Sequence, residues 1–446
     1  MRLVAPVLMF CGVTMAQTPP IRPNTPDVPV FPGFAVPLGG VNQEIGREPL
    51  TAEEAVQIAL RLQPALLSEF QAMRAARARA DQSRAALVPQ FSIGYNASDV
   101  QIVRGSEFSG SAGTGFRSSG SVSVTQLLFD FGRARSLVRQ QSSFARVAEH
   151  DYSQSQMDVA VSVRRAFYGH RQGLRLQEVS ESNLATRRSQ LALADARLNS
   201  GLGAPADLLR AKNAVAEATL ALTSARAAAV ASRMGLALSI GVDPRTPITL
   251  AESSEDAPSE DVEALIGSAL SQRPEILSAT AEVAANRHGL SFARSSNGPT
   301  LSFVASLNSR GGNDPLRDQT SSVGIGFNWP IGDGGLGAGR AREARAGLAG
   351  AEARLVQVTQ SVVAEVVQAS VELEAAEQRL TVALIQVQNA KELVRISEGR
   401  YSGGIGQFLE VTDAQDALFS AERNLANAEA GVQVARAALR RAVGRG

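Results

Sequence analysis

The chain carries one long pattern twice. An 18-residue stretch that begins at Arg197, RLNSGLGAPADLLRAKNA, aligns without a gap with RYSGGIGQFLEVTDAQDA, which begins at Arg400, 203 residues later. In each copy a helical pattern ends, matched glycines follow, and an acidic residue opens the next helical pattern. The same separation relates Asp130 to Asp333 and persists to the end of the chain. This series of matches indicates an internal duplication, so the chain is expected to fold as two related halves.

Each half is predicted to contain a helix, a pair of strands, a long helix, a glycine turn and a last helix. Pro64 and Pro274 interrupt the first helix of each half, and Pro89 and Pro299 stop it. Both pairs are separated by 210 residues, against 203 after the strands, so the second strand pair is seven residues shorter. The predicted domains are a first repeat (50–244), a linker (245–260) and a second repeat (261–444).

The longest helices have no proline. Residues 133–199 predict a helix of roughly 100 Å at ~1.5 Å per residue, and residues 338–400 predict a second. Thr51 is predicted to cap the first helix of the chain. The second long helix has a heptad seam made of two positions. The first position holds large apolar residues: Val366, Leu373, Leu380, Val387 and Val394. The second position, three residues further on, holds small residues: Ala369, Ala376, Ala383, Ala390 and Ser397. On this helix alone, an ordinary coiled coil of a fibrous protein is the simpler explanation.

The first residues read as an export signal. An apolar run over residues 3–13 ends in small residues, so residues 1–16 are predicted to be a signal peptide. Lipidation of Cys11 is the alternative, although Phe10 is bulky for such a site. Closely spaced prolines mark residues 17–49 as an extended leader. Later stretches lack the roughly 18 unbroken apolar residues of a membrane helix, so a membrane span would have to use strands.

Composition excludes several classes of function. Lys and Arg number 44 and Asp and Glu 43, so there is no charge surplus for nucleic acid. The three histidines, at 150, 170 and 288, have no spaced carboxylate or cysteine partner. The glycine-rich run over residues 332–337 lacks the Lys-Ser/Thr of a phosphate loop. The sequence therefore predicts neither an enzyme nor a metal or cofactor site.

Four short segments alternate apolar and polar residues with the period of a strand: 91–98, 121–125, 301–307 and 323–329. The loops between them are predicted over residues 100–120 and 308–320. One face is apolar and the other carries small polar residues, like the lipid and water faces of a membrane barrel. A soluble sheet covered on one face by a helix is the alternative.

Four strands are too few to close a membrane barrel, which needs about eight. An open sheet edge is not tolerated in lipid. If these strands lie in a membrane, several chains must share one barrel, and three chains with four strands each would give 12. Tyr95 and Trp329 are then candidates for the membrane–water interface.

Acidic residues follow each glycine turn: Asp207 in the first copy, Glu410 and Asp413 in the second. In a symmetric oligomer they would form rings of carboxylates, which favour cations and can close a mouth by hydrogen bonds. Placement at helix N-termini, where the dipole favours anions, explains the same residues without a channel. Both explanations can hold together.

These features resemble the TolC family of outer-membrane efflux proteins. The resemblance covers nearly all of the chain after about residue 50 and is carried by the duplication, by the strand exits QLLFDFGRAR and NWPIGDGGLGAGR, and by the turn RYSGGIGQFLEVTDAQ. It implies a mainly α fold with a long periplasmic α-helical barrel. It also implies a homotrimer whose four strands per protomer complete a 12-stranded β-barrel in outer-membrane lipid. The implied partners are a periplasmic adaptor and an inner-membrane transporter.

The same resemblance assigns roles to the two turns. Glu410 and Asp413 fall where the family carries its aspartate constriction, and Asp207 and Tyr401 fall where gate-closing hydrogen-bond partners are found. The turn glycines resemble the tips that meet the adaptor: Gly201, Gly203, Gly404 and Gly406. Glu410 replaces an aspartate. Gly406 stands where some members have an arginine that locks the closed state, which puts that salt bridge in doubt.

The sequence thus predicts a passive exit duct with an acidic periplasmic gate. It would belong to a tripartite efflux or type I secretion system. An exported structural coiled coil and a periplasmic adaptor are the alternatives, neither of which needs a pore. Solubility without detergent, together with a mass inconsistent with a trimer, would favour the coiled coil. An adaptor would not need two strand pairs with apolar faces.

Overall fold

The computed structural model describes residues 49–102, 113–254, 261–311 and 318–445. The predicted signal peptide, nearly all of the proline-rich leader and Cys11 lie outside these residues. The first half contains α2 (Ala52–Leu62), α3 (Pro64–Arg84), η1 (Ala85–Leu87), β1 (Gln90–Ile102), β2 (Gly113–Phe129), α4 (Arg133–Asn199) and α5 (Pro205–Ile240). The second half contains α6 (Val262–Gln272), α7 (Pro274–Arg294), β3 (Thr300–Gly311), β4 (Asp318–Asn328), α8 (Leu336–Ser402) and α9 (Phe408–Val443).

The two halves match element for element. The helices α4 and α8 each have 67 residues, and α5 and α9 each have 36. The helices α2 and α6 each have 11 residues, and α3 and α7 each have 21. The predicted fold class, mainly helical with four strands and an internal duplication, is confirmed.

Local chemistry sets the helix ends. Thr51 caps α2 in a capping box, in which the Glu54 amide donates to the Thr51 hydroxyl at 3.3 Å and the Thr51 amide donates to Glu54 at 2.9 Å. Asp130 and Asp333 each lie two residues before the N-cap glycine of a long helix and accept the amides of Ala134 and Gly337, both at 2.6 Å. The predicted cap at Thr51 is therefore confirmed, and the repeated aspartates receive a structural role.

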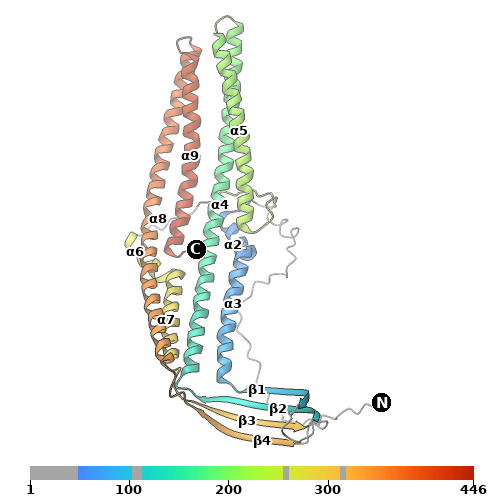
Figure 1. Cartoon of the computed structure of the whole chain (residues 1–446). Coiled ribbons are helices and arrows are strands. Elements are labelled where there is room, and N and C mark those ends of the chain that lie inside the picture. The colour runs from blue at the N-terminus through green and yellow to red at the C-terminus, as the bar shows by residue number, and fades with distance from the viewer. Residues whose placement is uncertain (1–48, 103–112, 255–260, 312–317, 446) are drawn as a thin grey trace, which may run out of the picture. The chain divides into compact units, whose positions relative to one another are not determined.

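The long helices pair into two antiparallel hairpins, α4 with α5 and α8 with α9 (Figure 1). The helix α4 also contacts α3, α7 and α9, so it joins the two halves. The predicted seam of α8 lies inside its hairpin, with Val366, Leu373, Ala376 and Val387 buried. Small residues at the second seam position allow the close approach that these hairpins show.

The strands form one antiparallel sheet in the order β1-β2-β3-β4. The predicted loops were too long, because residues 113–120 belong to β2 and residues 308–311 belong to β3. Glycine and serine dominate these stretches, and Phe116 is their one large apolar residue, so a period of two is not visible in them. The sheet ends in two unpaired edges, β1 and β4.

The two faces of the sheet differ sharply in chemistry. Strand register brings apolar residues together on one face, in rows such as Phe91, Val124, Ala305 and Val323. The opposite face carries rows of small polar residues, among them Ser92, Ser123, Ser306 and Ser322. Phe91 is 75% exposed and Val323 is 74% exposed, so the apolar face is not covered by the helices of its own chain.

One helix of the described part, α5, is long and apolar enough by composition to cross a membrane, although no unbroken apolar stretch predicted it. Its hydropathy comes largely from alanine, and it packs along α4, where Leu184, Ala218 and Leu222 form a buried cluster. The helix α5 is therefore one arm of the first hairpin.

Candidate functional site

The turns that close the two hairpins are built alike. Gly201, between α4 and α5, has a φ of +74°, and Gly404, between α8 and α9, has a φ of +79°. The amide after each glycine donates to the carbonyl of the arginine that opens the motif, at 2.9 Å (Leu202 to Arg197) and 3.1 Å (Ile405 to Arg400). Glycine is required at the first turn position because other residues rarely adopt this φ.

Gly203 and Gly406 are glycines for a different reason. A Cβ atom on Gly203 would lie 2.8 Å from the Leu198 backbone nitrogen, and one on Gly406 would lie 2.9 Å from the Tyr401 backbone nitrogen. These distances are shorter than any real Cβ contact, and the backbone there cannot yield cheaply. In this conformation the turn therefore has no room for an arginine at position 406.

The tips of the two hairpins are joined by Arg197 of α4. Its Nη1 donates to the Tyr401 carbonyl of α8 at 2.6 Å. The same guanidinium lies over the Tyr401 ring, 4.4 Å from the ring centroid. One cation thus makes a charge-assisted hydrogen bond and a cation–π contact to one residue of the other hairpin.

Tyr401 is buried beneath this contact. Its ring meets Phe408 edge-on at a centroid distance of 5.5 Å and belongs to a small apolar cluster with Ala194, Ala211 and Val411. Burial raises the pKa of the Tyr401 hydroxyl above its ordinary 10.0; the charge of Arg197 lowers it and that of Asp207 raises it. The hydroxyl is therefore neutral at physiological pH and available as a hydrogen-bond donor.

The predicted acidic residues lie around this contact, with different surroundings. Asp207 is half-buried in the first turn of α5, 3.5 Å from Arg210. Glu410 is exposed in the first turn of α9, 3.4 Å from Arg400, and Asp413 is exposed one turn further on. Within one protomer the structure thus brings Asp207 toward Tyr401 and leaves Glu410 and Asp413 at the surface.

Further polar contacts join α4 to α9 along the length of the hairpins. Arg187 forms an ion pair with Asp416, and the Gln172 amide donates to Asn427 at 2.7 Å. Arg441 pairs with Asp158 at 2.6 Å. The two hairpins are therefore held together at several levels, from the tips down to the end of α9.

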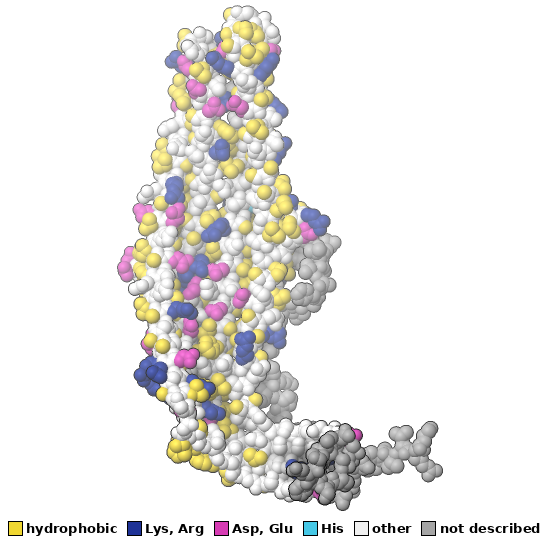
Figure 2. Space-filling model, in the orientation of Figure 1, with side chains coloured by type: hydrophobic (Ala, Val, Ile, Leu, Met, Phe, Trp, Pro, Cys, Tyr) yellow, Lys and Arg dark blue, Asp and Glu magenta, His cyan; other side chains and the backbone are white. Residues whose placement is uncertain are grey.

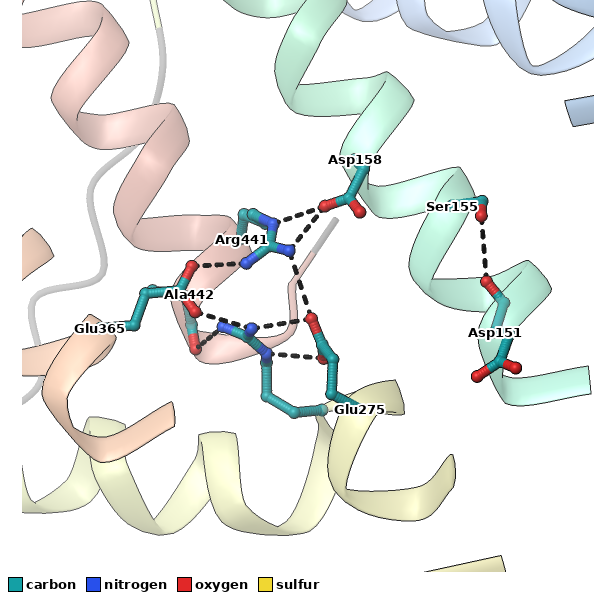
Figure 3. A network of polar contacts seen from close by, with 8 residues as sticks. Asp151, Ser155, Asp158, Glu275, Glu365, Arg441 and Ala442 are labelled. Atoms are coloured by element: carbon teal, nitrogen blue, oxygen red, sulfur yellow. Dashed lines mark hydrogen bonds and ion pairs between the residues drawn. The ribbon is translucent and has the colours of Figure 1, made fainter. Parts of the chain in front are cut away.

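The lowest of these contacts belongs to a partly buried ionic network, in which Arg273 is 3% exposed and Glu365 42% (Figure 3). Arg273, between α6 and α7, contacts both Glu275 and Glu365 at 2.8 Å and donates to the Ala442 carbonyl at 3.1 Å. Arg441 contacts both carboxylates and Asp158. Four helices, α4, α7, α8 and α9, thus meet around two arginines.

Sequence reasoning missed the roles of Arg197 and Arg273. The recurrence of Arg197 as Arg400 was visible, but the partner of Arg197 is a backbone carbonyl, which no side-chain pattern reveals. His170, one of the three histidines without a spaced carboxylate or cysteine partner in the sequence, is 3% exposed and lies 3.1 Å from the Ser232 hydroxyl. Burial and the charge of Arg233 lower its pKa below 6.5.

Comparison with known proteins agrees with this geometry. The sequence profile of the family described as "Outer membrane efflux protein" matches residues 55–242 and 265–445. The chain belongs to the outer membrane efflux protein family. Its location in the bacterial outer membrane and its class, an efflux channel, are the ones predicted from the sequence.

Two relatives within this family align over most of their length. The outer membrane efflux protein BepC of Brucella suis biovar 1 is 28% identical over 373 residues, covering 81% of this chain and 78% of BepC. Protein CyaE of Bordetella pertussis is also 28% identical, covering 83% of this chain and 79% of CyaE.

Solved structures of outer membrane channels share the fold of this efflux protein. The outer-membrane channel OprN superposes with a TM-score of 0.78 at 23% identity, covering 89% of this chain and 90% of OprN. The CmeC channel of Campylobacter jejuni gives a TM-score of 0.79 at 17% identity, covering 89% of this chain and 86% of CmeC. At these identities the likeness concerns the fold alone.

Proposed function

We propose that three copies of this chain form an exit duct through the outer membrane. The observation that carries the proposal is the sheet: four strands, two unpaired edges and one exposed apolar face. Open edges cannot remain in lipid, so the edges must pair with those of other copies. Three chains with four strands each give a closed barrel of 12, wide enough for a water-filled lumen lined by the small polar face.

The hairpin tips are the proposed gate of this duct. Around a threefold axis, Asp207, Glu410 and Asp413 would each form a ring of three carboxylates that attracts cations. Arg197 bound to Tyr401 would hold the two hairpins of a protomer in the closed arrangement. Because Gly406 leaves no room for a side chain, the contact that locks the closed state would come from Arg197 of α4, and this contact is termed the latch.

The same tips are the proposed contact with a periplasmic adaptor. Leu202 is 76% exposed and Ile405 is 79% exposed, and each lies directly after a turn glycine. These apolar side chains at matched positions suit docking to another protein. The duct itself is passive, and an inner-membrane transporter would supply the energy for drug efflux or for type I secretion.

The gate is tested by Glu410→Ala combined with Asp413→Ala. Single channels of the purified protein in planar bilayers should show higher conductance and weaker block by divalent cations than those of the wild type. Removal of two rings leaves less negative charge to hold cations at the mouth. Glu372→Ala combined with Glu374→Ala, exposed positions in the middle of α8, is the control.

Two results would contradict these proposals. Unchanged currents in the tip variant would remove the acidic gate while leaving the duct. A monomeric protein that dissolves without detergent would remove the duct itself and favour the coiled-coil alternative.

A further inference from the structure

Exposed arginines gather where the helices meet the sheet, and they recur in both halves. Arg84 and Arg294 end α3 and α7, and their numbers differ by 210, the separation of the repeats before the strands. Arg139 and Arg342 are each the seventh residue of a long helix, α4 or α8, and differ by 203. These four residues, all exposed, are termed the basic collar. Figure 2 shows Lys and Arg side chains clustered over the helices beside the sheet.

The helix dipole explains only half of the basic collar. Arg84 and Arg294 lie in last turns, where a cation is favoured. Arg139 and Arg342 are the seventh residues of their helices, beyond the first turn in which the dipole acts, so the dipole does not account for them. Neither α4 nor α8 has an acidic residue in its first turn. The same placement in both halves, without a gain in helix stability, indicates another requirement.

The basic collar also lacks the carboxylate partners that arginines slightly further from the sheet have. Arg77 contacts Glu149 at 2.8 Å, and the repeat-related Arg287 contacts Glu352 at 4.0 Å. Among the described residues, no carboxylate lies within 4.0 Å of Arg139, Arg294 or Arg342. Arg84 contacts the equally exposed Asp81, a pair that water screens.

The nearby carboxylates do not serve the basic collar either. Asp130 and Asp333, at the starts of α4 and α8, accept backbone amides. Arg135, in the first turn of α4, and Arg345, in the third turn of α8, are exposed and add positive charge, while the exposed Glu343 lies between Arg342 and Arg345 in the sequence. The region therefore keeps a surplus of positive charge.

Large apolar side chains lie directly beside the basic collar. Phe131, Trp329 and Ile331, between the sheet and the long helices, and Leu336, the first residue of α8, are all more than half exposed. Aromatic residues of this kind concentrate at membrane interfaces, and arginine stems cover apolar surface while the charge stays in water. The combination fits the boundary between hydrocarbon and headgroups.

The spacing also fits a headgroup layer. Arg139 and Arg342 lie six residues beyond the helix starts, or ~9 Å along the axis at ~1.5 Å per residue. Side chains on a helix lean toward its N-terminus, which here is the end at the sheet. The polar layer on one side of a bilayer is roughly 5–8 Å thick. The guanidinium groups therefore reach this layer when the sheet spans the hydrocarbon.

We propose that the basic collar binds anionic phospholipid headgroups of the leaflet that faces the periplasm. The occupant is a lipid phosphate, since two planar N–H donors of a guanidinium match two phosphate oxygens. This inference rests on the proposed duct, in which three chains would present 12 such arginines around the barrel. Binding fixes the depth at which the sheet sits in the membrane.

The test uses the full-length protein reconstituted in vesicles of equal phosphatidylglycerol and phosphatidylcholine. Lipids retained after mild detergent extraction are counted by native mass spectrometry. The wild type should retain phosphatidylglycerol in preference to phosphatidylcholine. The fourfold variant Arg84→Gln, Arg139→Gln, Arg294→Gln, Arg342→Gln should retain about one fifth or less, because each basic residue at a membrane surface contributes about fivefold in affinity. If the fourfold variant does not assemble, the double variant Arg139→Gln, Arg342→Gln is measured in its place.

The matched control removes the same charge far from the sheet: Arg188→Gln, Arg226→Gln, Arg379→Gln and Arg395→Gln, all exposed. Its lipid retention should equal that of the wild type. Equal loss in the control, or equal retention of both lipids by the wild type, would overturn the proposal. Displacement of the lipid by inorganic phosphate at equal concentration would also overturn it, because the site would then take any phosphate.

A separate measurement distinguishes this proposal from the duct. Wild type and variant should conduct with the same ion selectivity in planar bilayers of phosphatidylcholine. A shift toward cations in the variant would place the arginines in the water-filled lumen and overturn lipid binding. Failure of the wild type to conduct at all would instead remove the duct.

Discussion

The two halves of the molecule use the same backbone and different chemistry at one junction. In the second half, Arg273 and Arg441 meet Glu275 and Glu365. The repeat-related positions of the first half hold Gln63, Leu238, Ala65 and Ser162. There an ion pair, Arg164 with Glu53 at 2.8 Å, lies beside an apolar cluster that contains Leu236 and Ile240. The second half has the matching cluster around Leu439 and Val443. Duplication thus preserved the helix geometry while the means of joining the helices diverged.

This difference has consequences for how each half responds to change. An apolar cluster is stabilised by area removed from water, which depends little on pH or salt. A buried ionic network depends on every member, because the loss of one leaves another charge without a partner. The ionic half also reaches α4 of the first half through Asp158, so its loss would loosen both.

The largest expected effect follows from Arg273→Met. The change leaves Glu275 and Glu365 partly buried with fewer cations, and breaking such a group costs about 3–5 kcal/mol of unfolding free energy. Guanidinium unfolding followed by helical circular dichroism measures it. The control Gln63→Met, at the related position, should cost less than about 1 kcal/mol. Equal losses in both variants would remove the distinction between the halves.

A smaller effect is expected at the tips, where the repeat-related residues Arg197 and Arg400 have different partners. Arg197→Gln removes a half-buried hydrogen bond from a charged donor, worth about 1.5–3 kcal/mol. The closed state should weaken, and open-channel events in planar bilayers should become several-fold more frequent. Arg400→Gln loses an exposed pair with Glu410 worth less than about 1 kcal/mol. A larger effect from Arg400→Gln would refute the latch.

The smallest expected effect concerns pH. Burial raises the pKa of Glu275, but hydrogen bonds from Arg273 and the backbone and the charges of Arg273 and Arg441 outweigh it, so the pKa lies below 4.5. A lowered pKa stabilises the fold above the unfolded value, and this contribution is lost as pH falls through the folded value. The melting temperature should therefore drop below pH 4.5.

The same pH series separates the halves. Glu275→Gln should flatten the drop in melting temperature, because the titrating group is gone. Glu53, in the first half, also has a lowered pKa: burial raises it, and hydrogen bonds from Arg164 and Gln57 outweigh this. Its side chain is 60% exposed, so solvent screens the pair, and Glu53→Gln should flatten the drop less.

The helices could be predicted closely because their signals are local. The range 133–199 matches α4 at both ends, and the α8 seam matches the buried face. The strand ends could not be predicted, because glycine and serine dominate both faces near the connections and leave no apolar alternation. The roles of Arg197 and Arg273 depend on a carbonyl and on carboxylates brought together only by folding. The acidic residues at the tips remain a prediction.

The rows of serine on the polar face of the sheet have a consequence for traffic. Close to the helices this face is built of hydroxyls, glycine, amides and Val304, and charges begin further out, with Arg310 opposite Asp318 and with Arg117 opposite Ser98. In the proposed duct this face would line the lumen, and its part near the helices would offer a passenger no charge. Selection by charge would then fall to the carboxylates at the hairpin tips and to the two arginines at the far end of the sheet.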